Sequence, residues 1–136
     1  MNRNEMKIEF GSDPRNESFA RVVVASFMTR TNPTLEEVAD VKTAVSEAVT
    51  NSIIHGYGQK EGTIEIRAYI EERKLYIEIT DYGCGIEDVE KAMEPMFTTG
   101  KDGRSGMGFS FMEAFMDEVQ VESEPGKGTI VRMKKI

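Results

Sequence analysis

The sequence predicts an α+β fold, a two-layer sandwich of a mostly antiparallel sheet with helices on one face. Segments with apolar residues at helical spacing are partly segregated from segments in which apolar and polar residues alternate. No repeat, low-complexity tract or linker-like run divides the 136 residues. We therefore expect one domain that spans residues 1–136 and is long enough to bury a core.

The N-terminal segment predicts a strand followed by a helix. Met6, Ile8 and Phe10 alternate with charged residues, as in a short half-buried strand. A helix is expected after Pro14, with Asn16 as a candidate cap. The expected apolar face of this helix consists of Phe19, Val22, Val23 and Phe27.

The second predicted helix begins with a capping box. Thr34 is followed three residues later by Glu37, so the Thr34 hydroxyl can accept from the Glu37 amide while the Glu37 carboxylate reaches back. Gly56 is the expected stop. The apolar residues at helical spacing between these points are Leu35, Val38, Val41, Val45, Ala48 and Val49.

The rest of the chain predicts two hairpins with helices between them. Alternation over 64–70 and 75–79, around a turn at 71–73, indicates two antiparallel strands with one solvated face. The elements expected after them are a short helix around Glu87 to Met93, a helix over 109–116, and a hairpin of Val119–Val121 and Ile130–Met133 with its turn at 126–128.

Composition excludes several functional classes. There are 24 acidic and 17 basic side chains, a net charge of -7, which argues against general affinity for nucleic acids or anionic membranes. A single cysteine, Cys84, excludes a disulfide-stapled secreted module. The start of the chain lacks a secretory signal, and its longest apolar run, 22–25, is too short to cross a bilayer. We expect a reduced, cytoplasmic domain.

The second predicted helix carries a polar stripe. Glu47, Asn51 and His55 are spaced i, i+4, i+8 and project from nearly the same side. Taken alone, this stripe favours a solvated face with an Asn–Glu hydrogen bond, and His55 is expected to be a helix-end or packing residue. A second interpretation makes Asn51 an oxygen ligand for Mg²⁺ and Glu47 a proton acceptor.

A carboxylate ends the second strand of the middle hairpin. Counting by twos from Leu75 places Asp81 on the core-facing side, where a carboxylate needs hydrogen-bond donors. Thr129 has the same parity in the last strand, so the two side chains can meet a polar ligand edge such as a purine amine. Gly83 and Gly85 would let that ligand approach the backbone. The alternative is that the strand ends earlier and Asp81 opens a turn.

The third feature is a glycine-rich loop. Gly103–Gly108 precedes the helix that is expected to begin near Phe109, so its amides and the helix end can face phosphates. Lys101 and Arg104 add cations. A flexible surface loop would have a similar composition. The spacing fits neither a Walker A loop nor a Rossmann fingerprint.

Together, in this order, the three features resemble the Bergerat-fold superfamily, which includes gyrase, heat-shock-90 chaperones, histidine kinases and mismatch-repair ATPases. The resemblance implies a site for ATP or ADP with Mg²⁺. Asn51 would be the Mg²⁺ ligand, Glu47 the general base and Asp81 the partner of the adenine amine, with 94–106 as a lid. The other implied nucleotide-binding residues are Gly83, Gly85, Thr98, Thr99, Lys101, Gly103, Arg104, Ser105, Gly106, Met107, Gly108, Phe109 and Thr129.

Four runs, 16–21, 45–51, 97–99 and 104–109, are similar to the anti-sigma-F serine kinases of spore-forming bacilli. This similarity implies a homodimer in the bacterial cytoplasm, in the forespore. With ATP it would block a sporulation sigma factor, and it would phosphorylate a serine of an anti-anti-sigma factor. Glu17 and Arg21 would contact partners. Glu47 would act as catalytic base, and Arg104 would stabilise the transferring phosphoryl group.

Two other functions remain open from the sequence. One is an ATP-gated binding module without phosphotransfer, in which Glu47 is structural. The other is a detached histidine-kinase ATPase domain that labels a histidine of its partner. Self-phosphorylation on histidine is disfavoured because His55, the only histidine, lies in the predicted nucleotide-site helix.

Overall fold

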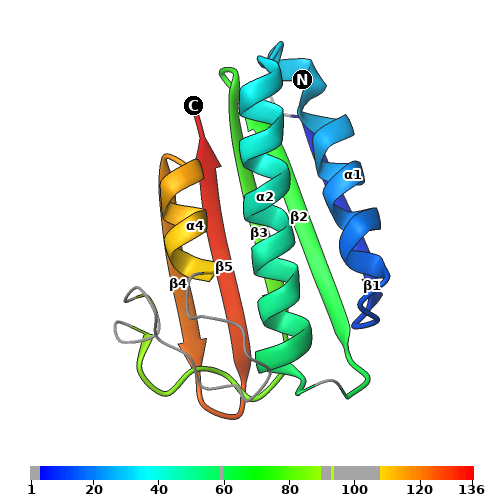
Figure 1. The fold of residues 1–136 in the computed structure, drawn as a ribbon, viewed down its shortest axis with the longest axis vertical. Coiled ribbons are helices and arrows are strands. Elements are labelled where there is room, and N and C mark those ends of the chain that lie inside the picture. The colour runs from blue at the N-terminus through cyan, green and yellow to red at the C-terminus, as the bar shows by residue number, and fades with distance from the viewer. Residues whose placement is uncertain (1–3, 59, 90–92, 94–107) are drawn as a thin grey trace.

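The computed structural model describes residues 4–58, 60–89, 93 and 108–136 (Figure 1). The elements in chain order are β1 (Asn4–Gly11), α1 (Asn16–Met28), the 3₁₀ turn η1 (Thr29–Thr31), α2 (Leu35–Asn51), the π-helical turn η2 (Ser52–Gly56), β2 (Thr63–Glu71), β3 (Lys74–Asp81), α4 (Gly108–Phe115), β4 (Glu118–Glu124) and β5 (Gly128–Lys135).

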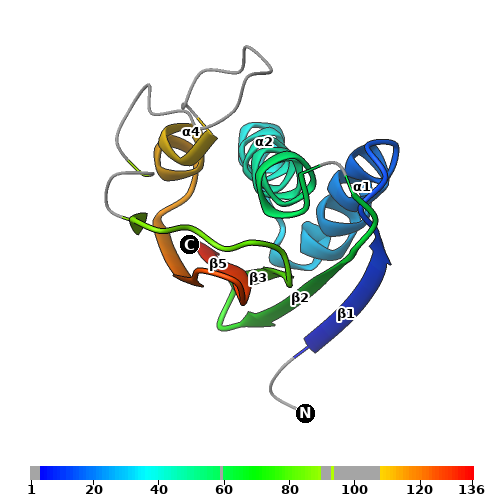
Figure 2. The same cartoon turned by 90° about the horizontal axis from the view of Figure 1, so that it is seen from below.

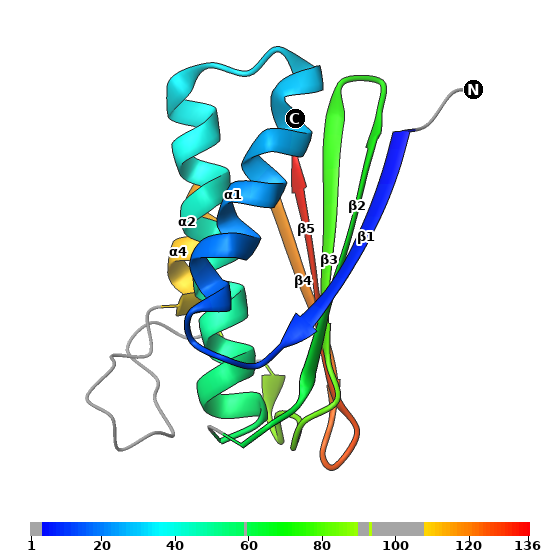
Figure 3. The ribbon, with the colours of Figure 1, turned by 90° about the vertical axis from the view of Figure 1, so that its right-hand side faces the viewer.

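The strands form one sheet in the order β1-β2-β3-β5-β4, and every neighbouring pair is antiparallel. Helices α1, α2 and α4 cover one face of it, as the views from below and from the side show (Figures 2 and 3). The predicted two-layer α+β class is therefore confirmed. No helix in the described part of the chain is long and apolar enough to span a bilayer.

The core lies between the helices and this face of the sheet. Alternate residues of β2 and β3 point into it, as the period of two requires. Its fully buried side chains include Val41, Val45 and Val49 from α2, and Ile64, Ile66, Leu75, Ile77 and Ile79 from the strands. The predicted middle hairpin is confirmed, and its turn residues Glu72 and Arg73 both have positive φ, as in a type I′ turn.

Helix α1 buries a different face from the predicted one. Its buried residues are Ala20, Val24 and Met28, spaced i, i+4, i+8, whereas Phe19 is 51% and Val22 58% exposed. The prediction for those two residues was wrong because apolar residues surround the helix, so their spacing did not define one stripe. The expected cap was also wrong: the Asn16 side-chain Nδ2 donates to the carbonyl oxygen of Gly11, and no side chain caps α1.

The capping box at the start of α2 is confirmed. The Glu37 amide donates to Thr34 Oγ1 at 3.1 Å, and the Thr34 amide donates to Glu37 Oε1 at 2.8 Å. Leu35, expected in the core, is 90% exposed. As the first helical residue it lies on the solvent side of the helix, before the buried stripe that begins at Val41.

Removal of the Thr34 hydroxyl tests this cap. Thr34→Ala is expected to lower the free energy of unfolding by about 1 kcal/mol, because it leaves a first-turn amide without its acceptor. Urea denaturation at constant pH measures this change. Thr43→Ala is the matched control, since the Thr43 hydroxyl bonds back to Ala39 O within the same helix, a contact that does not stabilise helices. An equal loss in both variants would contradict the role of the cap.

The C-terminal predictions hold within the described residues. Helix α4 begins one residue before the predicted start, and β4 and β5 form the expected hairpin. The short helix expected around Glu87 to Met93 lies partly outside the described residues. Within them, the Met93 amide donates to Val89 O at 3.1 Å. This hydrogen bond has the i to i−4 spacing of an α-helix.

Candidate nucleotide-binding site

Asp81 is a buried carboxylate at the end of β3, with 4% of its surface exposed. Ser52 Oγ donates to Asp81 Oδ2 at 2.8 Å, and the Gly83 amide donates to Oδ1 at 3.0 Å. Thr129 is the partner of Asp81 in the β3–β5 pairing. The alternative in which β3 ends before Asp81 is wrong, because Asp81 pairs with both Ile64 and Thr129 in the sheet.

The environment of Asp81 leaves it able to accept a further donor. An ionised carboxylate offers about four acceptor sites, and the hydrogen bonds from Ser52 and Gly83 use two of them. Burial raises the pKa of Asp81 above its ordinary value, while the hydrogen bonds from Gly83, Ser52 and Thr129 act in the opposite direction. A ligand amine that donates to Asp81 would also favour the ionised form.

The glycines around Asp81 allow backbone segments to meet closely. A Cβ on Gly83 would lie 2.0 Å from Gly56 O, and a Cβ on Gly85 would lie 2.1 Å from Glu124 O. The Cys84 amide also donates to Gly56 O at 2.8 Å. The sequence predicts a ligand in the space beside Gly83 and Gly85. In the structure the chain's own backbone lies at the Cβ position of each, and ligand contact with these two glycines stays a prediction.

Gly128, at the end of the turn between β4 and β5, lies against the backbone of Asp81. Gly126 and Gly128 have φ of +80° and +106°, a region that side chains rarely adopt. A Cβ on Gly128 would lie 2.1 Å from Asp81 O, whereas a Cβ on Gly126 would meet none of the described atoms within 4 Å. The two glycines thus share a conformational requirement, and only Gly128 is confined by β3.

Alanine at these two positions separates strain from crowding. Gly126→Ala is expected to cost about 1–2 kcal/mol, the penalty of a left-handed residue. Gly128→Ala adds a clash with the backbone of Asp81, so its loss should exceed that of Gly126→Ala by at least about 2 kcal/mol. Chemical denaturation of both variants measures the difference. Equal losses would show that β5 can shift away from Asp81 without cost.

Two further polar residues, Ser123 and Ser52, line the site and were not predicted from the sequence. Thr129 and Ser123 share a hydrogen bond of 2.8 Å between their hydroxyls, and Ser123 Oγ also accepts from the Ile86 amide. Ser52 holds Asp81 directly. The alternation along β4 could have identified Ser123, because it follows Val119 and Val121 in steps of two and so points to the same face of the sheet. Helical spacing could have identified Ser52, which follows the buried Ala48 by four.

Tyr57 joins the elements that surround Asp81. Its hydroxyl donates to Thr63 O, the first residue of β2, at 2.5 Å and accepts from the Tyr82 amide at 2.8 Å. Burial raises the pKa of this hydroxyl above its usual range. Tyr57 therefore fixes the segment after η2 against the start of β2 and the end of β3. No local sequence signal marks it.

Glu47 and Asn51 meet the first residue of α4. A Cβ on Gly108 would lie 3.0 Å from Asn51 Nδ2, 3.2 Å from Asn51 Oδ1 and 3.4 Å from Glu47 Oε2. The acid and the amide therefore project together toward the N-terminal end of α4, where backbone amides face outward. His55 lies in the last turn, η2, as expected for a helix-end residue.

The described side chains can supply only part of the coordination shell of a divalent cation. The Asn51 amide oxygen is a suitable ligand for Mg²⁺, which usually takes one or two protein groups and completes its shell with phosphate and water oxygens. Within residues 4–58, 60–89, 93 and 108–136, no group of three or more His, Cys, Asp or Glu side chains could hold a metal by itself. The chemistry of the donors therefore fits Mg²⁺ that arrives with phosphates.

The sequence pattern of the histidine kinase-like ATPase domain matches residues 10–135. Proteins named anti-sigma F factor match nearly the whole chain. One from Thermoanaerobacter pseudethanolicus is 60% identical over 133 residues, which cover 97% of this chain and 93% of that protein. One from Clostridium acetobutylicum is 60% identical over 136 residues, covering 99% and 95%. The chain belongs to the anti-sigma F factor family, within the histidine kinase-like ATPases.

Solved structures agree with the fold of this anti-sigma F factor family member. The RsbU and RsbW domains of Rv1364c from Mycobacterium tuberculosis superpose with a TM-score of 0.69 at 18% identity, covering 97% of this chain and 31% of that one. The catalytic domain of the histidine kinase ThkA gives a TM-score of 0.59 at 18% identity, covering 96% and 95%. At this identity the likeness concerns the fold alone.

Part of the predicted site of this family member lies outside the described residues. Gly108 begins α4, and Phe109, 8% exposed, packs into the core behind it. The site residues outside the described part are Thr98, Thr99, Lys101, Gly103, Arg104, Ser105, Gly106 and Met107.

The predicted partner contacts lie on α1. Arg21 Nη1 and Glu17 Oε1 are 3.8 Å apart, and 39% of the Arg21 side chain and 24% of the Glu17 side chain are exposed. Arg21 Nε is buried without a hydrogen-bond partner among the described residues. The two residues therefore form one partly exposed charged pair on the helix.

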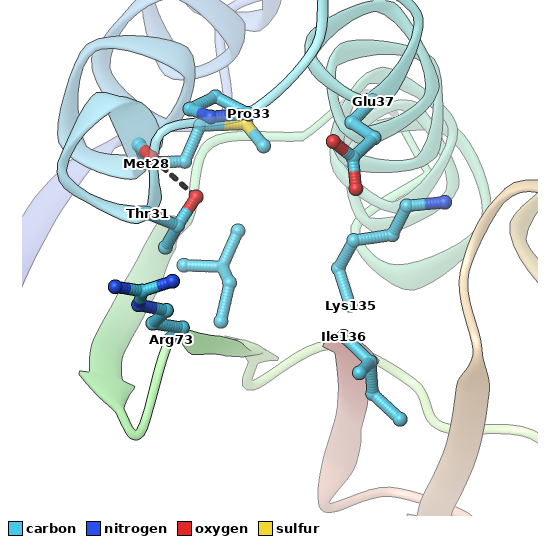
Figure 4. Close-up of a pocket in the computed structure, with 8 residues that line it drawn as sticks. Met28, Thr31, Pro33, Glu37, Arg73, Lys135 and Ile136 are labelled. Atoms are coloured by element: carbon cyan, nitrogen blue, oxygen red, sulfur yellow. Dashed lines mark hydrogen bonds between the residues drawn. The ribbon is translucent and has the colours of Figure 1, made fainter.

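A pocket at the opposite end of the sheet is lined by none of the predicted site residues (Figure 4). It has a volume of about 200 Å³ and lies where α1 ends, α2 begins and β5 ends. Thr31 Oγ1 donates to Met28 O there at 2.8 Å. Its lining residues in the described part of the chain are Met28, Thr31, Pro33, Glu37, Arg73, Leu75, Lys135 and Ile136.

Proposed function

We propose that this chain is a single ATP-binding domain that binds and inhibits a sporulation sigma factor when ATP is bound. We further propose that it transfers phosphate from ATP to a serine of an anti-anti-sigma factor and so inactivates that antagonist. The observation that carries this proposal is the convergence of Glu47 and Asn51 on the first residue of α4, in a chain about 60% identical to anti-sigma F factors.

The adenine end of the proposed site is Asp81. Its carboxylate is buried, held by Ser52 and Gly83, and retains acceptor capacity for an amine. Thr129 lies beside it across the β3–β5 pair. These features support Asp81 as the acceptor for the amine of adenine.

The phosphate end of the proposed site is the space before α4. When bound, ATP supplies the phosphoryl group and Mg²⁺ offsets the charge of its phosphates. Asn51 would hold the cation through its amide oxygen. Glu47 would accept the proton of the incoming serine hydroxyl. Arg104 and the loop amides before Gly108 are predicted to stabilise charge on the transferring group.

The proposed partners are proteins. A net charge of -7 favours a sigma factor that presents basic surface. The Glu17–Arg21 pair on α1 is the proposed contact, since its side chains are partly exposed and already oriented toward each other. We propose a homodimer in the cytoplasm of the forespore as the working form.

A phosphotransfer assay tests the proposed function. The chain is incubated with Mg²⁺, ATP labelled on the γ-phosphate and a matching anti-anti-sigma protein, and the modified residue is mapped. Acid-stable label on a serine is the expected result. No transferred label would leave an ATP-gated binding module, and acid-labile label on a histidine would indicate a detached histidine-kinase ATPase domain. Either result would overturn the serine kinase assignment.

A further inference from the structure

A buried pair of side chains joins η2 to β3. Ser52, the first residue of η2, is 5% exposed, and Asp81 is 4% exposed. Ser52 Oγ donates to Asp81 Oδ2 at 2.8 Å across 29 positions of sequence. Hydroxyls inside helices often bond back to the preceding turn, as Thr43 does to Ala39 O at 3.0 Å. The Ser52 hydroxyl instead crosses to the sheet.

We propose that Ser52 is a positioning residue that holds Asp81 as a fixed, acceptor-only group and thereby sets the preference for adenine over guanine nucleotides. This inference rests on the proposed role of Asp81 as the adenine acceptor. The inference adds Ser52 as a residue that acts through Asp81, and it predicts how the loss of the Ser52 hydroxyl changes the selection between adenine and guanine.

The orientation of the Asp81 carboxylate follows from its donors. Ser52 holds Oδ2 and the Gly83 amide holds Oδ1, so rotation of the carboxyl group would break both hydrogen bonds. A Cβ on Gly56 would lie 2.9 Å from Oδ1 and 3.0 Å from Oδ2, so the Gly56 backbone packs against the whole carboxyl group. The two donors therefore fix the orientation of the carboxyl group, and the acceptor sites that remain on its oxygens point in fixed directions, as recognition of an amine requires.

Base selection depends on the charge state of this carboxylate. Adenine presents an amine donor where guanine presents a carbonyl acceptor. An ionised carboxylate has only acceptor oxygens, so it can accept a hydrogen bond from the amine of adenine. Guanine would place its carbonyl oxygen against the carboxylate, and no hydrogen bond could form. A protonated carboxyl group can donate and would tolerate guanine. Burial opposes ionisation of Asp81, and the Ser52 hydroxyl is one of the donors that favour it.

The titratable groups around Asp81 are few among the described residues. His55 lies on η2 and Tyr57 follows it. Glu65 neighbours the paired Ile64 on β2, and Tyr82 and Cys84 follow β3. On β5 the paired residue is Thr129, which does not titrate. All five titratable groups are unchanged when Ser52 is replaced, so a shift that follows Ser52 reports on Asp81.

Three variants test the proposal by calorimetric titration with Mg-ATP and Mg-GTP. Ser52→Ala removes the donor, and Ser52→Thr keeps a hydroxyl. Ser46→Ala is the matched control, because Ser46 lies on α2 and its buried Oγ has no hydrogen-bond partner among the described residues. Ser52→Ala is expected to weaken ATP binding about tenfold, as loss of a hydrogen bond to a charged group does. The affinity for GTP should change less, so the ratio of the ATP affinity to the GTP affinity should fall.

The pH dependence of ligand binding would not change if Ser52 had only a structural role. Adenosine is the probe, since it has no phosphate to titrate, and its binding is followed by NMR. Binding should fall as pH decreases and Asp81 takes up a proton. With one donor fewer, Ser52→Ala should lose binding at a higher pH than Ser46→Ala, whereas Ser52→Thr should stay near the control.

The outcomes distinguish this proposal from the function on which it rests. If Ser52→Ala keeps both the ATP preference and the pH midpoint of Ser46→Ala, Ser52 does not position Asp81 and the inference is wrong. If Asp81→Asn binds ATP as the unmodified chain does, the adenine role itself fails. Weak ATP binding by Asp81→Asn together with unchanged selection by Ser52→Ala would overturn the positioning role alone.

Discussion

A Glu47→Gln variant should bind ATP and lose phosphotransfer by about 10²–10⁴-fold, the usual contribution of a positioned general base. Glutamine keeps the size and shape of glutamate, so the close packing of Gly108, whose Cβ position lies 3.4 Å from Glu47 Oε2, can persist. Its amide cannot take up the serine proton. Single-turnover transfer from labelled ATP to the anti-anti-sigma protein, with ATP affinity measured separately, tests both parts of the expectation.

Glu36→Gln is the matched control for this experiment. It makes the same chemical change on the same helix, at an exposed position in the first turn. This variant should transfer phosphate at the unmodified rate. Full activity of Glu47→Gln would remove Glu47 from the mechanism. A loss of ATP affinity as large as the loss of rate would assign Glu47 to binding instead of proton transfer.

An Asp81→Asn variant should bind ATP about 10- to 100-fold more weakly, the range expected when a hydrogen bond to a charged acceptor is lost. Asparagine fits the same space, but it has one acceptor oxygen in place of two. The Ser52 hydroxyl and the Gly83 amide both donate to the present carboxylate. The side-chain NH₂ would therefore face at least one of these donors or the adenine amine.

Calorimetric titration with Mg-ATP measures this loss, and Asp117→Asn is the control. Asp117 is exposed just beyond the end of α4, where its carboxylate accepts from the Ile136 amide. Its replacement should leave ATP affinity unchanged. ATP affinity that survives Asp81→Asn would count directly against adenine recognition by this carboxylate, whatever the result for Glu47.

Local sequence rules predicted those parts of the fold that depend on local chemistry. The Thr34–Glu37 box fixed the start of α2, and alternation fixed β2 and β3 with their buried faces. Parity along the strands predicted that Asp81 and Thr129 point inward, and both are buried. Each of these predictions uses residues within one element, where backbone geometry determines side-chain direction.

The remaining features depend on contacts between distant segments. The sequence shows that Gly83 and Gly85 permit close approach, but their neighbours, Gly56 O and Glu124 O, lie in other elements. Tyr57 joins β2 to the end of β3 through one hydroxyl, which no periodicity marks. The buried face of α1 was mispredicted for the same reason, since packing against α2 selects one of several apolar faces.

The division of the site between two hairpins has a consequence for folding kinetics. Hairpins such as β2–β3 and β4–β5 form from local contacts in about 1–10 μs. Pairing of β3 with β5 must close the long chain segment between them, at a higher entropic cost. Asp81 meets Thr129 only after that step. A ligand that needs both strands therefore binds after they have paired, and it prolongs the lifetime of the folded chain without accelerating its formation.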